Sequence, residues 1–186
     1  MYIGICGNQG SGKSSLANYL LVKYPNYIYV DVDKIGHKVN EIDEVKEELV
    51  RCFGDVLTDN KVDRKKLGSI VFNNKDNMQL LEDVTWKYME KEIDEIIKDN
   101  SNVIFAWMLL PKVKYFNKCD LKILLDIPKE VRMDRIIKRD GISKEYFELR
   151  DRNSFVYNYN DFNIILNNNN YEIFDNLQGL NLHKNY

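Results

Sequence analysis

The feature that most constrains this chain is a glycine-rich motif directly after an apolar run at its start. Residues 7–14 read G-x-x-x-x-G-K-S, the pattern of a phosphate-binding loop, and they follow the apolar run Tyr2–Cys6. The three glycines allow backbone conformations that are closed to residues with a Cβ, so that successive N–H groups can turn toward an anion. A helical apolar pattern begins at Ser14. Strand, loop and helix in this order predict a nucleotide-binding loop, which we call the phosphate loop.

Two side chains of the phosphate loop carry charge or a metal-binding oxygen. Lys13 is placed to span the β- and γ-phosphates of ATP, and the Ser14 hydroxyl is a hard oxygen ligand suited to Mg²⁺. The helix beginning at Ser14 turns the positive end of its dipole toward the phosphates. Mg²⁺ is therefore the expected cofactor. The candidate ATP-binding residues are Gly7, Asn8, Gln9, Gly10, Ser11, Gly12, Lys13, Ser14 and Ser15.

Composition limits the possible partners and surroundings. The 186 residues include 44% hydrophobic side chains, enough for the core of one α/β domain, and the net charge of −2 predicts neither a nucleic acid nor a membrane partner. Cys6, Cys52 and Cys119 lack C-x-x-C spacing and are interpreted as reduced thiols. With no targeting or membrane-spanning pattern, we expect an untargeted, cytoplasmic protein, with a monomer as the default.

The first candidate catalytic residue follows a short apolar strand at residues 27–30. Asp33 lies just beyond that strand, where open α/β sheets bind their ligands. Its carboxylate could accept the proton of an attacking hydroxyl, help to order Mg²⁺, or cap the helix that begins at Lys34. These roles are not mutually exclusive.

Apolar periodicity predicts the remaining elements of the fold. Helical patterns cover residues 42–53, 63–72 and 74–98, while residues 102–110 and 121–126 read as buried parallel strands and residues 162–166 as an edge or final strand. We predict a three-layer α/β/α P-loop NTPase fold with a parallel sheet, a helical substrate-side region and a helical lid. The chain 1–186 is read as one kinase domain, with its core at about 1–39, 100–127 and 160–178, the substrate-side region at about 40–99 and the lid at about 128–155.

The predicted lid is rich in arginine. Its first helix, with Pro128 as first residue, carries Arg132, Arg135 and Arg139, and a second helix runs from Ser143 to about residue 154. Basic side chains on a mobile helix pair suit a lid that closes over the transferring phosphoryl group. The alternative is a solvated surface of charges paired with nearby acids.

Two further stretches are interpreted as having no functional role. Asn117-Lys118-Cys119-Asp120 matches the guanine-reading N-K-x-D motif, but here a strand follows the motif instead of preceding it, so we expect no guanine site. The asparagines of residues 167–170 read as a turn with compositional bias, residues 171–177 as a short helix, and residues 181–186 as a frayed tail.

The order of motifs resembles the dephospho-coenzyme A kinase family over about residues 2–168. The resemblance rests on the phosphate loop, on D-x-D-K-I-G-H-x-V at residues 31–39, on D-R-K-K-L-G-x-I-V-F at residues 63–72, and on later matches at Arg135, Arg139–Ser143, Arg150 and residues 165–168. It implies transfer of the γ-phosphoryl of ATP to the ribose 3′-hydroxyl of dephospho-coenzyme A, the last step of coenzyme A biosynthesis. It also implies that Asp33 is the catalytic aspartate, that Lys13, Arg135 and Arg139 act on phosphates, and that Asp33, His37 and Arg64 contact the acceptor.

The chain departs from the family pattern on the acceptor side. Trp86-Lys87 stands where the family usually has His-Pro, Lys112 stands in place of a glutamate, and Ser154 in place of a glutamine. The phosphate-binding positions are intact, so these departures affect the acceptor side alone. The alternative functions are a nucleoside or nucleoside monophosphate kinase of the same build, a non-catalytic nucleotide-binding protein, and a switch or motor ATPase.

Overall fold

The computed structural model describes residues 1–72 and 74–177, which belong to two compact units. The first unit joins residues 1–31 to the chain from residue 99 onward, and the second contains residues 32–98. The predicted tail at residues 181–186 lies outside the described residues.

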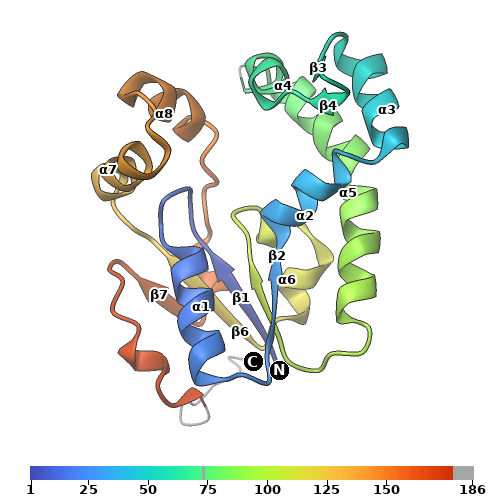
Figure 1. Ribbon diagram of the computed structural model, residues 1–186. Coiled ribbons are helices and arrows are strands. Elements are labelled where there is room, and N and C mark those ends of the chain that lie inside the picture. Colours follow the sequence, from blue (N-terminus) through green and yellow to red (C-terminus); the bar gives the residue numbers. More distant parts are fainter. Residues whose placement is uncertain (73, 178–186) are drawn as a thin grey trace. The chain divides into compact units, whose positions relative to one another are not determined.

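The buried apolar runs of the first unit form one parallel five-stranded sheet (Figure 1). The strand order is β2-β5-β1-β6-β7, with the strands at β1 (Tyr2–Cys6), β2 (Ile28–Asp31), β5 (Val103–Ala106), β6 (Leu121–Leu125) and β7 (Ile164–Leu166). On central β1, Ile3 pairs with Ile104 on one side and with Leu121 on the other. These residues are fully buried, as expected for a sheet covered on both faces.

Helices cover both faces of this sheet and complete the predicted three-layer α/β/α fold. Helix α1 (Lys13–Lys23) packs Leu16, Ala17 and Leu20 into the main apolar core. On the other face, Tyr115 of α6 (Lys114–Lys118) stacks on Phe105 of β5 with ring centroids 5.5 Å apart. Because the strands are parallel, the segments after β1, β2, β5, β6 and β7 emerge at one edge of the sheet, and the phosphate loop lies at that edge.

Two further helices of the first unit follow β6. Helix α7 (Lys129–Asp140) ends at Gly141, which takes a left-handed conformation with φ 64°, and α8 (Lys144–Asp151) begins after the N-cap Ser143. Together they occupy most of the segment predicted to be the lid. The lid role itself stays a prediction, as does the substrate-side role of residues 40–99.

The second unit is mostly helical. Its elements are α2 (Val32–Val39), α3 (Asp43–Phe53), the hairpin β3 (Leu57–Thr58) and β4 (Lys61–Val62), α4 (Arg64–Val71) and α5 (Lys75–Ile97). The side chains of Asp63 and Asn74 cap α4 and α5 by accepting backbone N–H bonds, which explains where these helices begin. Asp59 and Asn60 form the hairpin turn with φ values of 50° and 59°.

Several predicted boundaries are corrected by the structure. The strand predicted over residues 102–110 ends at Ala106. Ala106 is the last residue of β5 that pairs with both neighbouring strands, with Ile5 of β1 on one side and Asp31 of β2 on the other. The chain then turns into the 3₁₀ helix η1 (Leu110–Lys112), and α6 was not predicted. Pro128 is the N-cap of α7 with ψ 142°, not its first helical residue. In place of the helix predicted over residues 171–177, the chain forms the short 3₁₀ turn η3 (Glu172–Phe174).

Each helix among the described residues is either too short or too polar to span a bilayer.

Candidate active site

The phosphate loop takes the backbone path that its glycines permit. Gly7, Gly10 and Gly12 have φ values of 146°, 81° and 98°, a region that side chains with a Cβ rarely adopt. At Gly12 the surroundings are also too close, because a Cβ there would lie 2.6 Å from the Nδ2 atom of Asn169. Gly12 is the N-cap of α1, which begins at Lys13, one residue before the predicted start.

Lys13 reaches back across the phosphate loop. Its Nζ donates to the carbonyls of Gly7 at 2.9 Å and of Asn8 at 3.3 Å. Ser14 and Ser15 follow in the first turn of α1 with exposed side chains, so the Ser14 hydroxyl is accessible at the positive end of the helix dipole. The loop thus combines a cation, a hydroxyl and a helix N-terminus.

Four side chains outside the loop hold four successive loop carbonyls. Arg132 donates to Gln9 O at 3.1 Å, Arg135 to Gly10 O at 3.3 Å, Asn169 to Ser11 O at 3.1 Å and the Tyr171 hydroxyl to Gly12 O at 3.3 Å. We call these side chains the carbonyl clamp. The structure thereby corrects the interpretation of the asparagine-rich stretch as compositional bias alone, because Asn169 contacts the phosphate loop.

Arg132 is a buried charge at the junction of the loop with α7 and α8. Its Nε donates to Ile127 O at 3.1 Å, and its Nη1 donates to Asp151 Oδ1 at 2.7 Å. Burial raises the pKa of Asp151, but hydrogen bonds from Arg132 and from Ser154, at 2.7 Å, outweigh burial and leave that pKa below its ordinary value. The solvated-surface alternative is therefore wrong for Arg132.

A second set of contacts ties the start of the loop to the chain after α8. The Asn8 side chain accepts from Phe155 N at 2.9 Å and donates to Phe155 O at 3.3 Å. The Tyr157 hydroxyl accepts from Gly7 N and donates to Met108 O, both at 3.0 Å. Tyr157 thus connects the phosphate loop to the segment that follows β5. No local sequence pattern marked these contacts.

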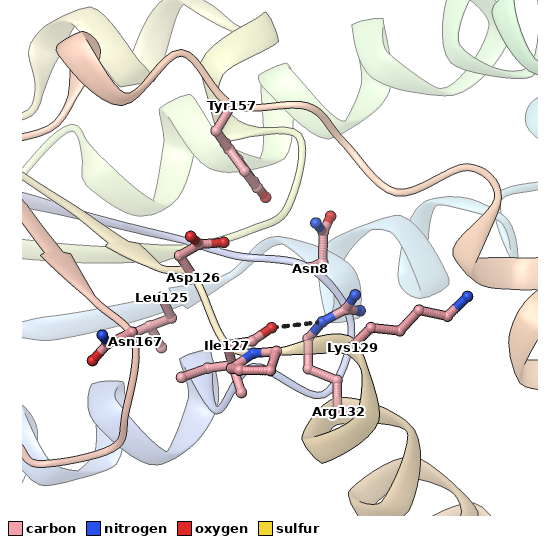
Figure 2. A pocket seen from close by; sticks show the side chains of 9 residues that line it. Asn8, Leu125, Asp126, Ile127, Lys129, Arg132, Tyr157 and Asn167 are labelled. Carbon is pink, nitrogen blue, oxygen red and sulfur yellow. Dashed lines mark hydrogen bonds between the residues drawn. The ribbon is translucent and has the colours of Figure 1, made fainter.

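A cavity of about 400 Å³ adjoins this corner of the loop (Figure 2). It is lined by Asn8, Leu125, Asp126, Ile127, Pro128, Lys129, Arg132, Tyr157 and Asn167. Lys13 and Ser14 are not among its lining residues, so the cavity borders the start of the phosphate loop and not the expected phosphate position. The Tyr159 hydroxyl donates to the Asp126 carboxylate, which raises the pKa of Tyr159.

The two predicted phosphate-contacting arginines of α7 differ in their surroundings. Arg135 reaches the phosphate loop through Gly10 O, whereas Arg139 is held by Asp140 in a bidentate pair with distances of 2.6 and 3.0 Å. The hydrogen bond from Arg139 lowers the pKa of Asp140. The structure therefore brings Arg135, but not Arg139, against the loop.

The predicted acceptor-side residues all belong to the second unit. Asp33 and His37 lie four residues apart on α2, with both side chains exposed, and exposed Arg64 is the first residue of α4. Because α2 begins at Val32, Asp33 lies in its first turn and is not its N-cap, so the capping alternative is wrong in that form. A first-turn carboxylate still interacts favourably with the helix dipole.

The departures from the family pattern have local contacts. Lys87 of α5 forms an ion pair with Glu48 of α3 at 3.0 Å, and Ser154 donates to Asp151. Lys112 is exposed at the end of η1.

The N-K-x-D match lies between α6 and the start of β6. Asn117 and Lys118 end α6, and Asp120 precedes β6. The Asp120 carboxylate accepts from Tyr2 N at 2.8 Å, and Asp120 N donates to Tyr2 O at 2.8 Å, so Asp120 joins the residue before β6 to the first residue of β1. Because β1 and β6 both begin here and the phosphate loop follows the end of β1, this is the sheet edge opposite the phosphate loop.

Comparison with known proteins identifies the family. A family model described as dephospho-CoA kinase matches residues 1–170. The chain belongs to the dephospho-CoA kinase family. Members of this family with similar sequences include the dephospho-CoA kinases of Aquifex aeolicus, 37% identical over 80% of this chain and 77% of the relative, and Fusobacterium nucleatum, 35% identical over 80% and 78%.

Solved structures agree with this family and fold. A dephospho-CoA kinase from Campylobacter jejuni is similar with a TM-score of 0.59 and 25% identity, covering 94% of this chain and 91% of the other. TT1252 from Thermus thermophilus gives a TM-score of 0.73 with 26% identity, covering 90% and 88%. A deoxyadenosine kinase from M. mycoides, at 18% identity and a TM-score of 0.52 over 90% and 91%, shares the fold alone.

Proposed function

We propose that this protein transfers the γ-phosphoryl group of ATP to the ribose 3′-hydroxyl of dephospho-coenzyme A. The observation that carries the proposal is membership of the dephospho-CoA kinase family over residues 1–170, together with a complete phosphate loop. The similarity to a deoxyadenosine kinase is one of fold, so it does not favour a nucleoside acceptor. The intact Lys13, Ser14 and Asp33 argue against a protein that binds nucleotide without turnover.

On the donor side, the loop amides and Lys13 would bind the phosphates of ATP. Lys13 would exchange the carbonyls of Gly7 and Asn8 for phosphate oxygens, because these carry more negative charge. Arg135, and Arg139 once released from Asp140, would offset the charge that develops on the transferred group. The protein then contributes mainly positioning and charge stabilisation.

Mg²⁺ fits the donor groups of this chain. The exposed Ser14 hydroxyl would be its protein ligand, and the described residues contain no group of three His, Cys, Asp or Glu side chains that could hold a metal. Mg²⁺ commonly keeps several waters and binds through few protein oxygens and the substrate phosphates, so one hydroxyl suffices. The ion would neutralise phosphate charge when it is bound.

On the acceptor side, Asp33 would take the proton of the attacking hydroxyl. His37 shares helix α2 with Asp33, and Arg64 begins α4, so both offer polar side chains to the acceptor. These assignments follow the D-x-D-K-I-G-H-x-V and D-R-K-K-L-G motifs of the sequence.

The test is a coupled assay of ADP release with Mg-ATP. We expect selective turnover with dephospho-coenzyme A over a panel of nucleosides and nucleoside monophosphates. Turnover of a nucleotide instead, ADP release without any acceptor, or no turnover would each contradict the proposal. Lys112→Glu belongs in the same assay. If the change from glutamate to Lys112 has no effect on the choice of acceptor, this variant phosphorylates dephospho-coenzyme A about as well as the parent.

A further inference from the structure

The carbonyl clamp acts on consecutive peptide groups of the phosphate loop. Its donors reach the carbonyls of residues 9, 10, 11 and 12 in order, at 3.1 to 3.3 Å. Two of the donors come from α7 and two from the segment after β7, so elements that surround the loop fix its outer side. No motif of the sequence assigned a function to Asn169 or Tyr171.

The geometry of the peptide group relates these contacts on the outside of the loop to the direction of the N–H groups on its inside. In a planar trans peptide, the C=O and the following N–H point in opposite directions. The contacts on the carbonyls of residues 9 and 11 therefore direct the N–H groups of residues 10 and 12 toward the inside of the loop. Gly12 O accepts from Tyr171 and also from Leu16 N at 3.0 Å, the first helical hydrogen bond of α1, so Tyr171 and the start of α1 together direct the Lys13 N–H. The fourth contact, on Gly10 O, directs Ser11 N–H inward, where it donates to Asn8 O at 3.1 Å.

The two donors after β7 are themselves fixed. Asn169 Nδ2 also donates to the Tyr171 hydroxyl at 2.6 Å, and the Tyr171 ring packs against Tyr19 of α1 with centroids 5.7 Å apart. The missing Cβ at Gly12 leaves room for both, because a Cβ would lie 2.6 Å from Asn169 Nδ2 and 2.9 Å from the Tyr171 hydroxyl. Gly12 is therefore needed both for the backbone conformation of the loop and for the space that Asn169 and Tyr171 occupy.

We propose that Asn169 and Tyr171 are positioning residues for nucleotide binding, which preset the Gly12 and Lys13 amides for the phosphates of ATP through the Ser11 and Gly12 carbonyls. They act through the loop backbone and do not touch the nucleotide for this purpose. The inference rests on the ATP-binding part of the proposed function and is independent of the acceptor.

The test measures binding of Mg-ATP and of inorganic tripolyphosphate by calorimetry, without acceptor. Tyr171→Phe keeps the ring against Tyr19 and removes the hydroxyl, and Asn169→Ala removes the amide. Loss of one hydrogen bond predicts that each variant weakens both ligands by about twofold to tenfold. In ¹⁵N spectra, Asn169→Ala should shift mainly the Gly12 amide and Tyr171→Phe mainly the Lys13 amide.

Tyr19→Phe is the matched control. It removes the hydroxyl of the partner ring, which donates to Asp175 and not to the loop, and it should leave both affinities unchanged. Unchanged affinities in both clamp variants would overturn the proposal. So would equal losses in the control, or losses confined to ATP, which would indicate contact with the base or ribose. A parent protein that binds no tripolyphosphate at millimolar concentration would also contradict a preset anion site.

The acceptor assay separates this proposal from the proposed function. If the clamp variants lose phosphate affinity as predicted while dephospho-coenzyme A is not phosphorylated, the acceptor assignment fails and the clamp stands. If dephospho-coenzyme A is turned over while the variants bind both ligands normally, the clamp fails and the proposed function stands.

Discussion

At the scale of single residues, Asp33 occupies the second position of α2, two residues after the end of β2. Its first-turn position accounts for a helix-dipole interaction worth about 0.3–1 kcal/mol when the carboxylate is exposed. A general base contributes far more, typically about 10²–10⁴-fold in rate. A neutral residue in place of Asp33 should therefore cost a little stability if the carboxylate only interacts with the helix dipole, and a large part of the catalytic rate if it is the general base.

We expect Asp33→Asn to lower kcat by about 10²–10⁴-fold while leaving the Kd for ATP unchanged, because the amide cannot accept the proton of the acceptor hydroxyl. Single-turnover rates and ATP calorimetry measure the two quantities. Asp43→Asn is the control, since Asp43 is another exposed first-turn carboxylate, on α3. If both variants lost only a few-fold in rate and melted at similarly lowered temperatures, Asp33 would have no role as general base and would only interact with the dipole of α2.

At the scale of elements, α7 and α8 are joined by one buried pair. Arg132 and Asp151 have side chains that are 7% and 10% exposed, and the arginine also holds the phosphate loop. Removing one partner of such a pair leaves the other charge buried, which costs on the order of 3 kcal/mol. The Arg139–Asp140 pair of the same helix is more exposed, at 66% and 28%, and is worth less than about 1 kcal/mol.

The pair predicts a specific dependence on pH. The pKa of Asp151 lies below its ordinary value in the folded protein, so its contribution to stability is present above about pH 4 and is lost as the pH falls through the folded pKa. The difference in free energy of unfolding between the parent and Asp151→Asn should be largest near pH 7 and shrink on acidification. Urea unfolding at a series of pH values measures it. Asp140→Asn should show a much smaller difference at every pH, and equal differences in the two variants would contradict a special role of the buried pair.

The elements of this fold could be predicted from local patterns, but the side-chain contacts of the site only in part. Glycine spacing located the phosphate loop, and Asp63 and Asn74 marked helix starts, because these signals act within a few residues. Asn169 contacts a carbonyl 158 residues away, and no local pattern distinguishes it from its neighbouring asparagines. The burial of Arg132 depends on the packing of three segments, whereas its sequence neighbourhood is that of an exposed charged helix.

At the scale of the whole molecule, the candidate residues divide between the two units. Lys13, Ser14, Arg135 and Arg139 belong to the first unit, and Asp33, His37 and Arg64 belong to the second. The site assignments therefore predict that donor and acceptor stabilise different parts of the chain.

Hydrogen exchange measures this division. Mg-ATP alone should slow amide exchange in residues 7–14 and in residues 165–177, because the carbonyl clamp links these segments. Dephospho-coenzyme A alone should slow exchange within residues 32–98. If Mg-ATP slowed exchange only in residues 7–14, the result would contradict the clamp. If the acceptor slowed exchange only in the first unit, the result would contradict an acceptor-side role of Asp33, His37 and Arg64.

The position of Asn169 and Tyr171 in the chain has a consequence for how the protein is made. A ribosome produces the G-x-x-x-x-G-K-S motif first, but the donors to Ser11 O and Gly12 O are translated about 160 residues later. A nascent chain therefore displays the motif throughout its synthesis without the contacts that set it. A stop codon after residue 135 and before residue 169 would yield a product that any motif search recognises as nucleotide-binding but that lacks Asn169 and Tyr171, half of the clamp on which its binding of phosphate depends.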